Sequence, residues 1–196
     1  MRLQISLDGS GIRSLAEAIT AIGEERARQA YARAINRVGE GALNATAGAL
    51  ARQTGLPVRV TRKALENPSK ATPARLEFFK GVRGDDIGLK HFKARETCKG
   101  VSAAPFGQRR VFAHTFQKGA LFPRRVELPS LNGHVFLPDT AVKRWGRLPI
   151  VKQKSGVVLP EQVVQGASRA AFEAHTSRLA GRVEHEIRVI TKGIVS

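Results

Sequence analysis

Residues 27–55, ARQAYARAINRVGEGALNATAGALARQTG, decide the fold of this chain because one helical stripe runs along almost their whole length. Apolar side chains recur there at steps of three and four residues, which is the period of an α-helix. They are Ala27, Tyr31, Ile35, Val38, Ala42, Ala45 and Ala49. The many alanines on the stripe indicate that another element approaches this helix closely. Gly55, with Pro57 behind it, predicts where the helix ends.

The helical pattern extends toward the N-terminus, so the whole helical part is expected to cover residues 10–53. Its first stripe consists of Ile12, Leu15, Ile19 and Ile22. Ser10 is the expected N-cap, because its hydroxyl can accept a hydrogen bond from an unpaired backbone N–H. Gly23 predicts a bend or a break between the two stripes. After the helix, residues 56–73 are expected to form a loop around one short helical turn.

The middle of the chain, residues 74–155, changes to short apolar runs bounded by Gly or Asp, which are typical of antiparallel strands joined by turns. The runs are ARLEFFKGV (74–82), DIGLKHFKAR (86–95), GVSAA (100–104), RRVFAHTF (109–116), GHVFLP (133–138), TAVKRW (140–145) and PIVKQ (149–153). Residues 117–133 between them are rich in Pro, Gly and Arg. A loop of this length in a compact domain is expected to be functional or disordered.

The helical period returns after Pro160 and Glu161, two residues that suit the first turn of a helix. We therefore expect a C-terminal helix over residues 160–192. A sheet with one apolar face needs a cover, and the two terminal helices are the candidates. The prediction is a single α+β domain over residues 1–196, in which a long N-terminal helix and a C-terminal helix pack on a central antiparallel β-sheet with a long extended loop.

Charge is the strongest overall signal, since 33 Lys and Arg against 16 Asp and Glu give a formal net charge of +17. The excess is concentrated between Thr97 and Pro160, where eleven basic residues face two acidic ones. Such an excess is costly in self-repulsion unless a polyanion or an acidic partner neutralises it. No apolar run approaches the roughly 20 residues that span a bilayer, so no membrane partner is expected.

The residue types that usually carry catalysis form no recognisable pattern. The EHE at 184–186 differs from the H-E-x-x-H of zinc proteases, in which two imidazoles share one helical face. The DGSG at 8–11 lacks the Lys-Ser/Thr ending of a phosphate loop, and Asp85 and Asp86 point apart if they lie on a strand. Cys98 is the only cysteine, which excludes a disulfide within the chain. The sequence predicts no catalytic residue, no metal site and no cofactor, and therefore not an enzyme.

Clusters of basic side chains are instead candidates for contact with nucleic acid. No recognition helix or zinc finger is apparent, so the contact predicted is with phosphates, without sequence preference and sensitive to salt. The alternative is a solvated surface that only keeps the protein in solution. The DNA-facing candidates are Arg59, Arg62, Lys63, Arg109, Arg110, Lys143, Arg144, Arg147, Lys152 and Lys154.

Several segments, taken in order, resemble the minor tail protein Z family of tailed bacteriophages and prophages. They are AINRVGEGALNATAGALARQTGLPVRVTRKAL (34–65), IGLKHFKARETCKGVS (87–102), NGHVF (132–136) and GRLPIVKQKSGVVLPE (146–161). In that family a sheet segment of the PL-x-x-F-x-AR-x-T-x-x-GV kind leads to a GH-x-x-VF-x-R hairpin. An RLPI element and a terminal helix follow. The resemblance covers most of the chain, and its specificity lies in the order and spacing of the segments.

The resemblance implies a tail completion or minor tail protein at the head-proximal end of the tail, where the tail joins the neck and surrounds the genome end. It implies an oligomeric ring, expected to be a hexamer, with tail terminator or tube proteins and head–neck connector proteins as neighbours. The genomic DNA phosphate backbone would pass through the ring. The expected location is the virion, after synthesis in the bacterial host cytoplasm. The alternative function is a sequence-nonspecific nucleic-acid-binding protein of the host or prophage.

The apolar residues around the last of these segments are candidates for the joint between subunits, because interface cores favour Trp. The subunit-interface candidates are Phe136, Trp145, Leu148, Pro149 and Ile150. The alternative for Trp145 is that it fills the core of the monomer.

Overall fold

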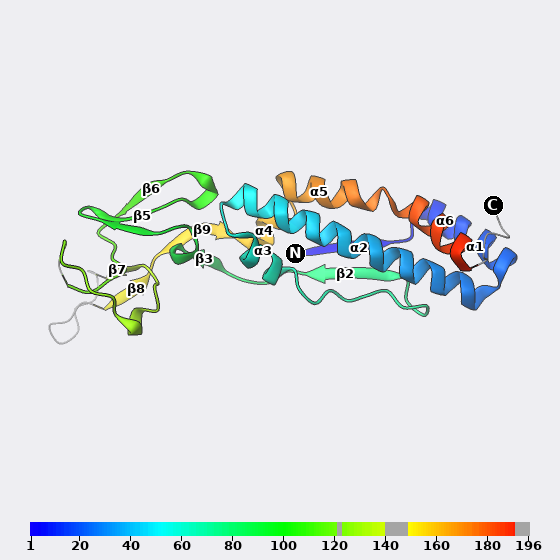
Figure 1. Cartoon of the computed structure of the whole chain (residues 1–196), viewed down its shortest axis with the longest axis horizontal. Coiled ribbons are helices and arrows are strands. Elements are labelled where there is room, and N and C mark those ends of the chain that lie inside the picture. The colour runs from blue at the N-terminus through cyan, green and yellow to red at the C-terminus, as the bar shows by residue number, and fades with distance from the viewer. Residues whose placement is uncertain (121–122, 140–148, 191–196) are drawn as a thin grey trace.

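A computed structural model describes residues 1–120, 123–139 and 149–190 of the chain. The molecule is elongated, and its longest helix lies along the long axis (Figure 1). Helices occupy one end together with the first two strands, and the other short strands occupy the opposite end. Helices and antiparallel strands are both present, as is the long N-terminal helix, so the predicted α+β class is confirmed.

The long helix is α2, Glu24–Thr54, and it is separated from α1, Gly9–Ile22, by the predicted break at Gly23. Gly23 has a φ of 86°, which a glycine adopts without the steric cost that a Cβ would add. Gly55 ends α2 in the left-handed conformation, and its N–H donates to the carbonyl of Ala51 at 2.9 Å. The expected close approach is also present, because a Cβ on Gly39 would lie 2.7 Å from the aromatic ring of Phe78.

The N-cap of α1 is Asp8 and not the expected Ser10. The Asp8 carboxylate accepts hydrogen bonds from the Gly11 N–H at 2.8 Å and from the Ser10 hydroxyl at 2.7 Å. A carboxylate accepts more strongly than a hydroxyl at a helix N-terminus, where the helix dipole adds to the attraction. The N-cap, and with it the start of the helix, therefore lies two residues earlier than expected.

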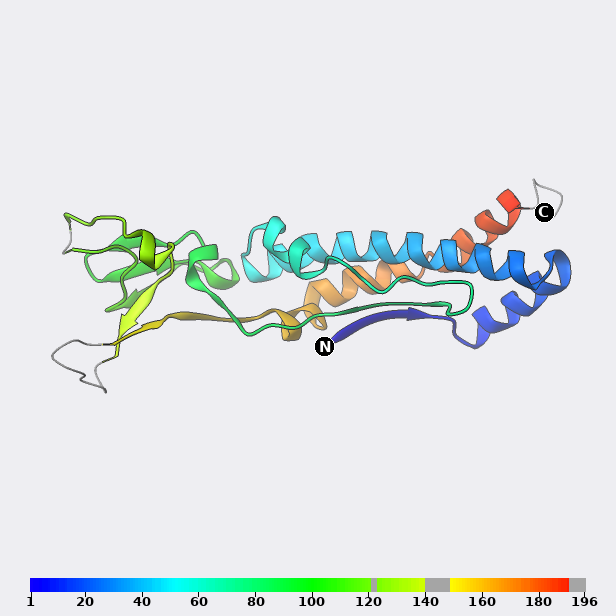
Figure 2. The same cartoon turned by 90° about the horizontal axis from the view of Figure 1, so that it is seen from below.

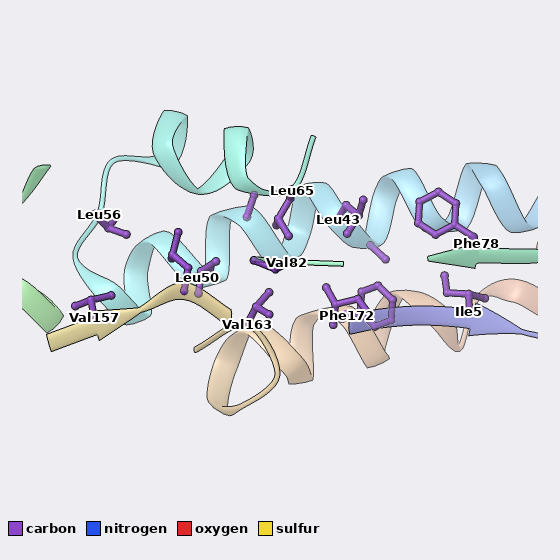
Figure 3. Close-up of a cluster of buried hydrophobic side chains, with 14 of the residues drawn as sticks. Ile5, Leu43, Leu50, Leu56, Leu65, Phe78, Val82, Val157, Val163 and Phe172 are labelled. Atoms are coloured by element: carbon purple, nitrogen blue, oxygen red, sulfur yellow. The ribbon is translucent and has the colours of Figure 1, made fainter. Parts of the chain in front are cut away.

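The expected helical turn after α2 is α3, Val58–Ala64. Together with α2 it encloses the main apolar core, which also receives side chains from β2, β9, α4 and α5 (Figure 3). Leu43 and Leu50 of α2 face Val82, Val157 and Val163 there. Burial of such side chains, worth about 1.5–3 kcal/mol each, is the main force that holds the strands and C-terminal helices to α2.

The strands differ in arrangement from the expected central sheet, since those described form four small antiparallel sheets. Their bounds are β1, Arg2–Ser6; β2, Glu77–Gly81; β3, Asp86–Gly88; β4, Arg95–Thr97; β5, Gly100–Ala103; β6, Arg110–Ala113; β7, Phe136–Pro138; β8, Ile150–Lys152; and β9, Lys154–Val158. β1 pairs with β2, β3 with β9, β7 with β8, and β4, β5 and β6 form a meander. The described strands are three to five residues long, and among them only the ladder of β1 and β2 lies along α2 in place of the expected central sheet.

We define the β lobe as residues 86–120, 123–139 and 149–158. It contains β3 to β9 and three short 3-10 helices, Leu89–His91, Pro105–Gly107 and Pro129–Leu131. The lobe projects beyond the end of α2, away from α1 and α6 (Figure 1). The expected strand at 140–145 lies outside the described residues.

The expected C-terminal helix is divided into α4, Leu159–Val163, α5, Gly166–Thr176, and α6, Leu179–Ile190. Pro160 lies in the first turn of α4, as predicted. The break before α5 is held by Gln53 of α2, whose side chain donates to the carbonyl of Gln162 at 3.1 Å and accepts from the Ser168 N–H at 3.2 Å. α5 and α6 then pack along α2. Among the described helices, none has the length and apolar character needed to cross a membrane.

Candidate nucleic-acid interface

Seven of the ten DNA-facing candidates lie in the described part of the chain, and all seven are exposed. Lys143, Arg144 and Arg147 lie outside the described residues. The seven form two groups. One group is on α3, and the other is in the β lobe. α3 lies beside the C-terminal end of α2, whereas the β lobe extends beyond that end (Figures 1 and 2).

The α3 group consists of Arg59, Arg62 and Lys63, and a buried threonine fixes its orientation. Thr61 is fully buried, and its hydroxyl donates to the carbonyl of Ala47 on α2 at 2.9 Å. This bond holds one side of the short helix against α2. The three basic side chains are exposed to solvent.

The β-lobe group includes two arginines that are held by neighbouring strands. Arg110 lies over the aromatic ring of Phe112, with its guanidinium carbon 4.7 Å from the ring centroid, and it donates to the Ser155 carbonyl at 3.2 Å. Arg109 donates to the Ser102 hydroxyl at 3.1 Å. A guanidinium has five N–H donors, so each arginine keeps donors for a phosphate while its position is fixed.

A second set of basic groups surrounds His134, and we call Lys90, His91, His134 and Lys152 the cationic cluster. The Lys90 ammonium lies 2.9 Å from Nε2 of His134. Burial and the charges of Lys90, Lys152 and His91 lower the pKa of His134. Burial and the charge of Lys90 likewise lower the pKa of His91. Sequence reasoning did not find this cluster, because Lys90 and His134 are 44 residues apart.

The charge of the β lobe is not balanced by its carboxylates. The lobe contains eleven Lys and Arg against four Asp and Glu. Within the described residues, none of the seven candidates forms an ion pair with a carboxylate. The acids serve the fold instead. Asp86 accepts from the N–H groups of Ser155 at 2.9 Å and Gly156 at 2.8 Å. The exposed cations are therefore available to an external anion.

The segment 117–133, expected to be functional or disordered, is anchored at its start by Glu96. The Glu96 carboxylate accepts from the Lys118 N–H at 2.8 Å and lies 3.3 Å from the guanidinium of Arg125. A backbone bridge joins Gly119 to Val126 with bonds of 2.8 and 3.0 Å. Residues 121–122 within this segment lie outside the described part of the chain.

The subunit-interface candidates have different surroundings. Phe136 is buried in the β lobe and packs against Phe116, with the two ring centroids 6.2 Å apart, so the chain's own core accounts for it. Pro149 is half-buried, whereas Ile150 is 45% exposed. Trp145 and Leu148 lie outside the described residues.

Other reactive groups are dispersed through the described residues. Within the described residues, no three or more His, Cys, Asp or Glu side chains are grouped so that they could hold a metal ion. Cys98 is exposed. Comparison of the chain with protein-family models, curated proteins and solved structures gives no match.

Proposed function

We propose that this chain is a structural component of a phage tail, a minor tail or tail completion protein at the head-proximal end. In this role it forms an oligomeric ring that joins the tail to the neck and surrounds the path of the DNA. The observation that carries the proposal is the group of exposed cations without ion-pair partners, which stand on ordered elements of an elongated molecule. The order of the sequence segments that resemble the tail protein Z family supports it.

The residues of the β lobe meet the physical requirements of a ring through which DNA passes. A channel that DNA must pass through needs weak phosphate contacts that do not depend on base sequence. Lysine and arginine side chains supply such contacts, and several copies around one duplex add their attractions through multivalency. Strong binding by one copy would hold the DNA and hinder its passage. The proposal therefore expects weak binding by the isolated chain.

Mass measurement and localisation test the proposal together. The purified chain is expected to form a closed oligomer by light scattering and electron microscopy, and purified particles are expected to contain it at the head-proximal end of the tail. A chain that is absent from particles would overturn the virion role. A ring whose central opening is lined by carboxylates or apolar side chains would overturn the DNA-passage role.

The same unpaired cations also favour the second function, a free nucleic-acid-binding protein of the host or prophage. A salt titration of DNA binding by the monomer separates the two. Nanomolar, steeply salt-dependent binding by a monomer would favour the free binding protein. Millimolar binding, or none, would favour the tail component.

A further inference from the structure

β1 is paired along one edge only. The N–H of Val82 donates to the carbonyl of Met1 at 3.0 Å. This bond shows which residues of β1 turn their backbone groups toward β2. In an antiparallel ladder the backbone groups of successive residues point alternately toward the partner and away from it. The N–H and C=O groups of Arg2, Gln4 and Ser6 therefore point away from β2. Within the described residues these groups have no backbone partner.

The free edge of β1 borders a groove of about 1080 Å³. β1 and α1 form one wall, and α5 and α6 form the other, with Ile5 of β1 and Phe172 of α5 among the lining residues (Figure 3). Leu179 and Val183 of α6 also line it. Tyr31 of α2 reaches the same groove, and its buried hydroxyl oxygen has no hydrogen-bond partner among the described residues. The groove thus combines apolar walls with unused hydrogen-bonding groups.

The charge of the groove is opposite to that of the chain as a whole. Four exposed acids line it against two bases, Arg2 and Arg169. The acids are Asp8, Glu17, Glu173 and Glu184. In a chain with a net charge of +17, this local excess of acid favours a basic occupant, and a second copy of the same chain supplies one.

β8 in the basic lobe offers the complementary edge. The Asp139 N–H donates to the carbonyl of Pro149 at 2.7 Å, and the Gln153 N–H donates to the carbonyl of Val135 at 2.8 Å, so the residues that flank β7 and β8 are hydrogen-bonded pairs. By the same alternation, the N–H and C=O groups of Ile150 and Lys152 point away from β7. β8 is also the one described strand in which every residue is exposed, and Ile150 and Val151 are 45% and 47% exposed. Among the described residues this edge has no strand beside it, and an exposed edge with apolar side chains is a template for pairing with another chain.

We propose that β8 of one copy adds to the free edge of β1 in the next copy as an antiparallel strand, which covers the groove. This inference rests on the proposed oligomeric ring and names its subunit contact. Side chains of opposed residues in a ladder lie on the same face of the sheet. Ile150 and Lys152 would therefore lie on the exposed face, beside Gln4. Val151 would lie on the buried face with Ile5 and point into the apolar groove. The contact joins two different surfaces, and repeated head-to-tail contacts of this kind close into rings.

The first test is a disulfide between copies in a Cys98→Ser background, so that the native thiol does not compete. Copies with Gln4→Cys or Ser6→Cys are mixed with copies carrying Ile150→Cys and are mildly oxidised. One of the two mixtures is expected to cross-link, because opposed Cα atoms lie about 5.5 Å apart, within the reach of a disulfide. Val151→Cys is the control, since its side chain lies on the other face. Equal cross-linking by the Ile150→Cys and Val151→Cys copies, or no cross-linking by either, overturns the strand pairing.

The second test removes one N–H from the free edge. Gln4→Pro leaves the ladder with β2 intact, because the Gln4 N–H points away from it, and Gln4→Ala is the matched control that keeps the N–H. We expect Gln4→Pro to raise the concentration needed for assembly roughly tenfold relative to Gln4→Ala, measured by light scattering. Circular dichroism checks that both variants are folded. Equal assembly by the two variants overturns the pairing.

The measured mass of the unsubstituted chain distinguishes the two proposals. If the chain assembles but neither test gives the expected difference, the contact between β1 and β8 is overturned and the ring stands. If the chain remains monomeric at every concentration, in purified form and in particles, the ring and its contact are both overturned.

Discussion

The ammonium of Lys90 lies 2.9 Å from Nε2 of His134, and this contact favours the neutral form of the imidazole. An ammonium group can only donate, so Nε2 is the acceptor and the imidazole is neutral. Burial and the surrounding cations lower the pKa of His134 accordingly. The geometry of the cationic cluster therefore depends on pH.

We predict that the free energy of unfolding falls as the pH drops below 6.5, the ordinary pKa of histidine. The unfolded chain takes up a proton on His134 at a higher pH than the folded chain does. The stabilising contribution is thus complete above pH 6.5 and is lost as the pH falls toward the lowered pKa. His134→Gln keeps an acceptor oxygen but does not titrate. It should flatten this part of the profile in urea unfolding measured between about pH 8 and pH 5. An unchanged slope in the variant would contradict the assignment.

The contact between Gly39 and Phe78 predicts a large effect of one methyl group. Gly39→Ala places a Cβ 2.7 Å from the aromatic ring, so the free energy of unfolding should fall by about 1–3 kcal/mol. Gly48→Ala on the same helix is the control, because its Cβ would meet only the Arg52 guanidinium, at 3.8 Å. That variant should gain about 0.5–1 kcal/mol from helix propensity. Chemical denaturation measures both, and effects of the same sign would disprove the packing argument.

Asp86 and Asp85 form a matched pair for testing the attachment of the β lobe. Asp86→Ala leaves the N–H groups of Ser155 and Gly156 without their acceptor, which should cost about 1–3 kcal/mol of stability. Asp85→Ala changes an exposed side chain and should stay within about 0.5 kcal/mol. Hydrogen exchange at the Ser155 and Gly156 amides should rise only in Asp86→Ala. Equal protection in both variants would refute this role of Asp86.

The salt dependence of DNA binding tests which of the two groups of cations, the α3 group or the β-lobe group, contacts DNA. Each lost phosphate contact lowers the slope of log K against log salt by about 1. A triple Gln variant of Arg110, Lys152 and Lys154 should therefore flatten the slope by up to about 3 if the β lobe faces DNA. The α3 variant carries Gln at Arg59, Arg62 and Lys63. The charge-matched control carries Gln at Arg26, Arg33 and Arg37, exposed residues of α2. Equal slopes in all three variants would indicate general charge attraction only.

The helical part of the fold could be predicted because its determinants are local. The period of α2, the break at Gly23 and the proline in the first turn of α4 all depend on neighbouring residues. β1 was missed although Leu3 and Ile5 alternate with polar residues, the pattern of a half-buried strand. Its partner β2 begins more than 70 residues later, and such pairing cannot be deduced from one sequence.

The candidate site was predicted as a list of residue types but not as an arrangement. Sequence reasoning identified the basic residues, yet it could not separate the α3 group from the β lobe, because tertiary packing around the end of α2 sets their relative positions. The cluster around His134 is a tertiary contact. The many carboxylates of the chain could not be sorted by sequence into those that balance charge and those, such as Asp86 and Glu96, that accept backbone hydrogen bonds.

The chain enters the β lobe through β3 and leaves it through β9, and these two strands are paired with each other. The entry and exit points are therefore neighbours, in the manner of an inserted segment. A change of length in the exposed loops beyond this strand pair would therefore leave the path of the chain through the helical body unchanged.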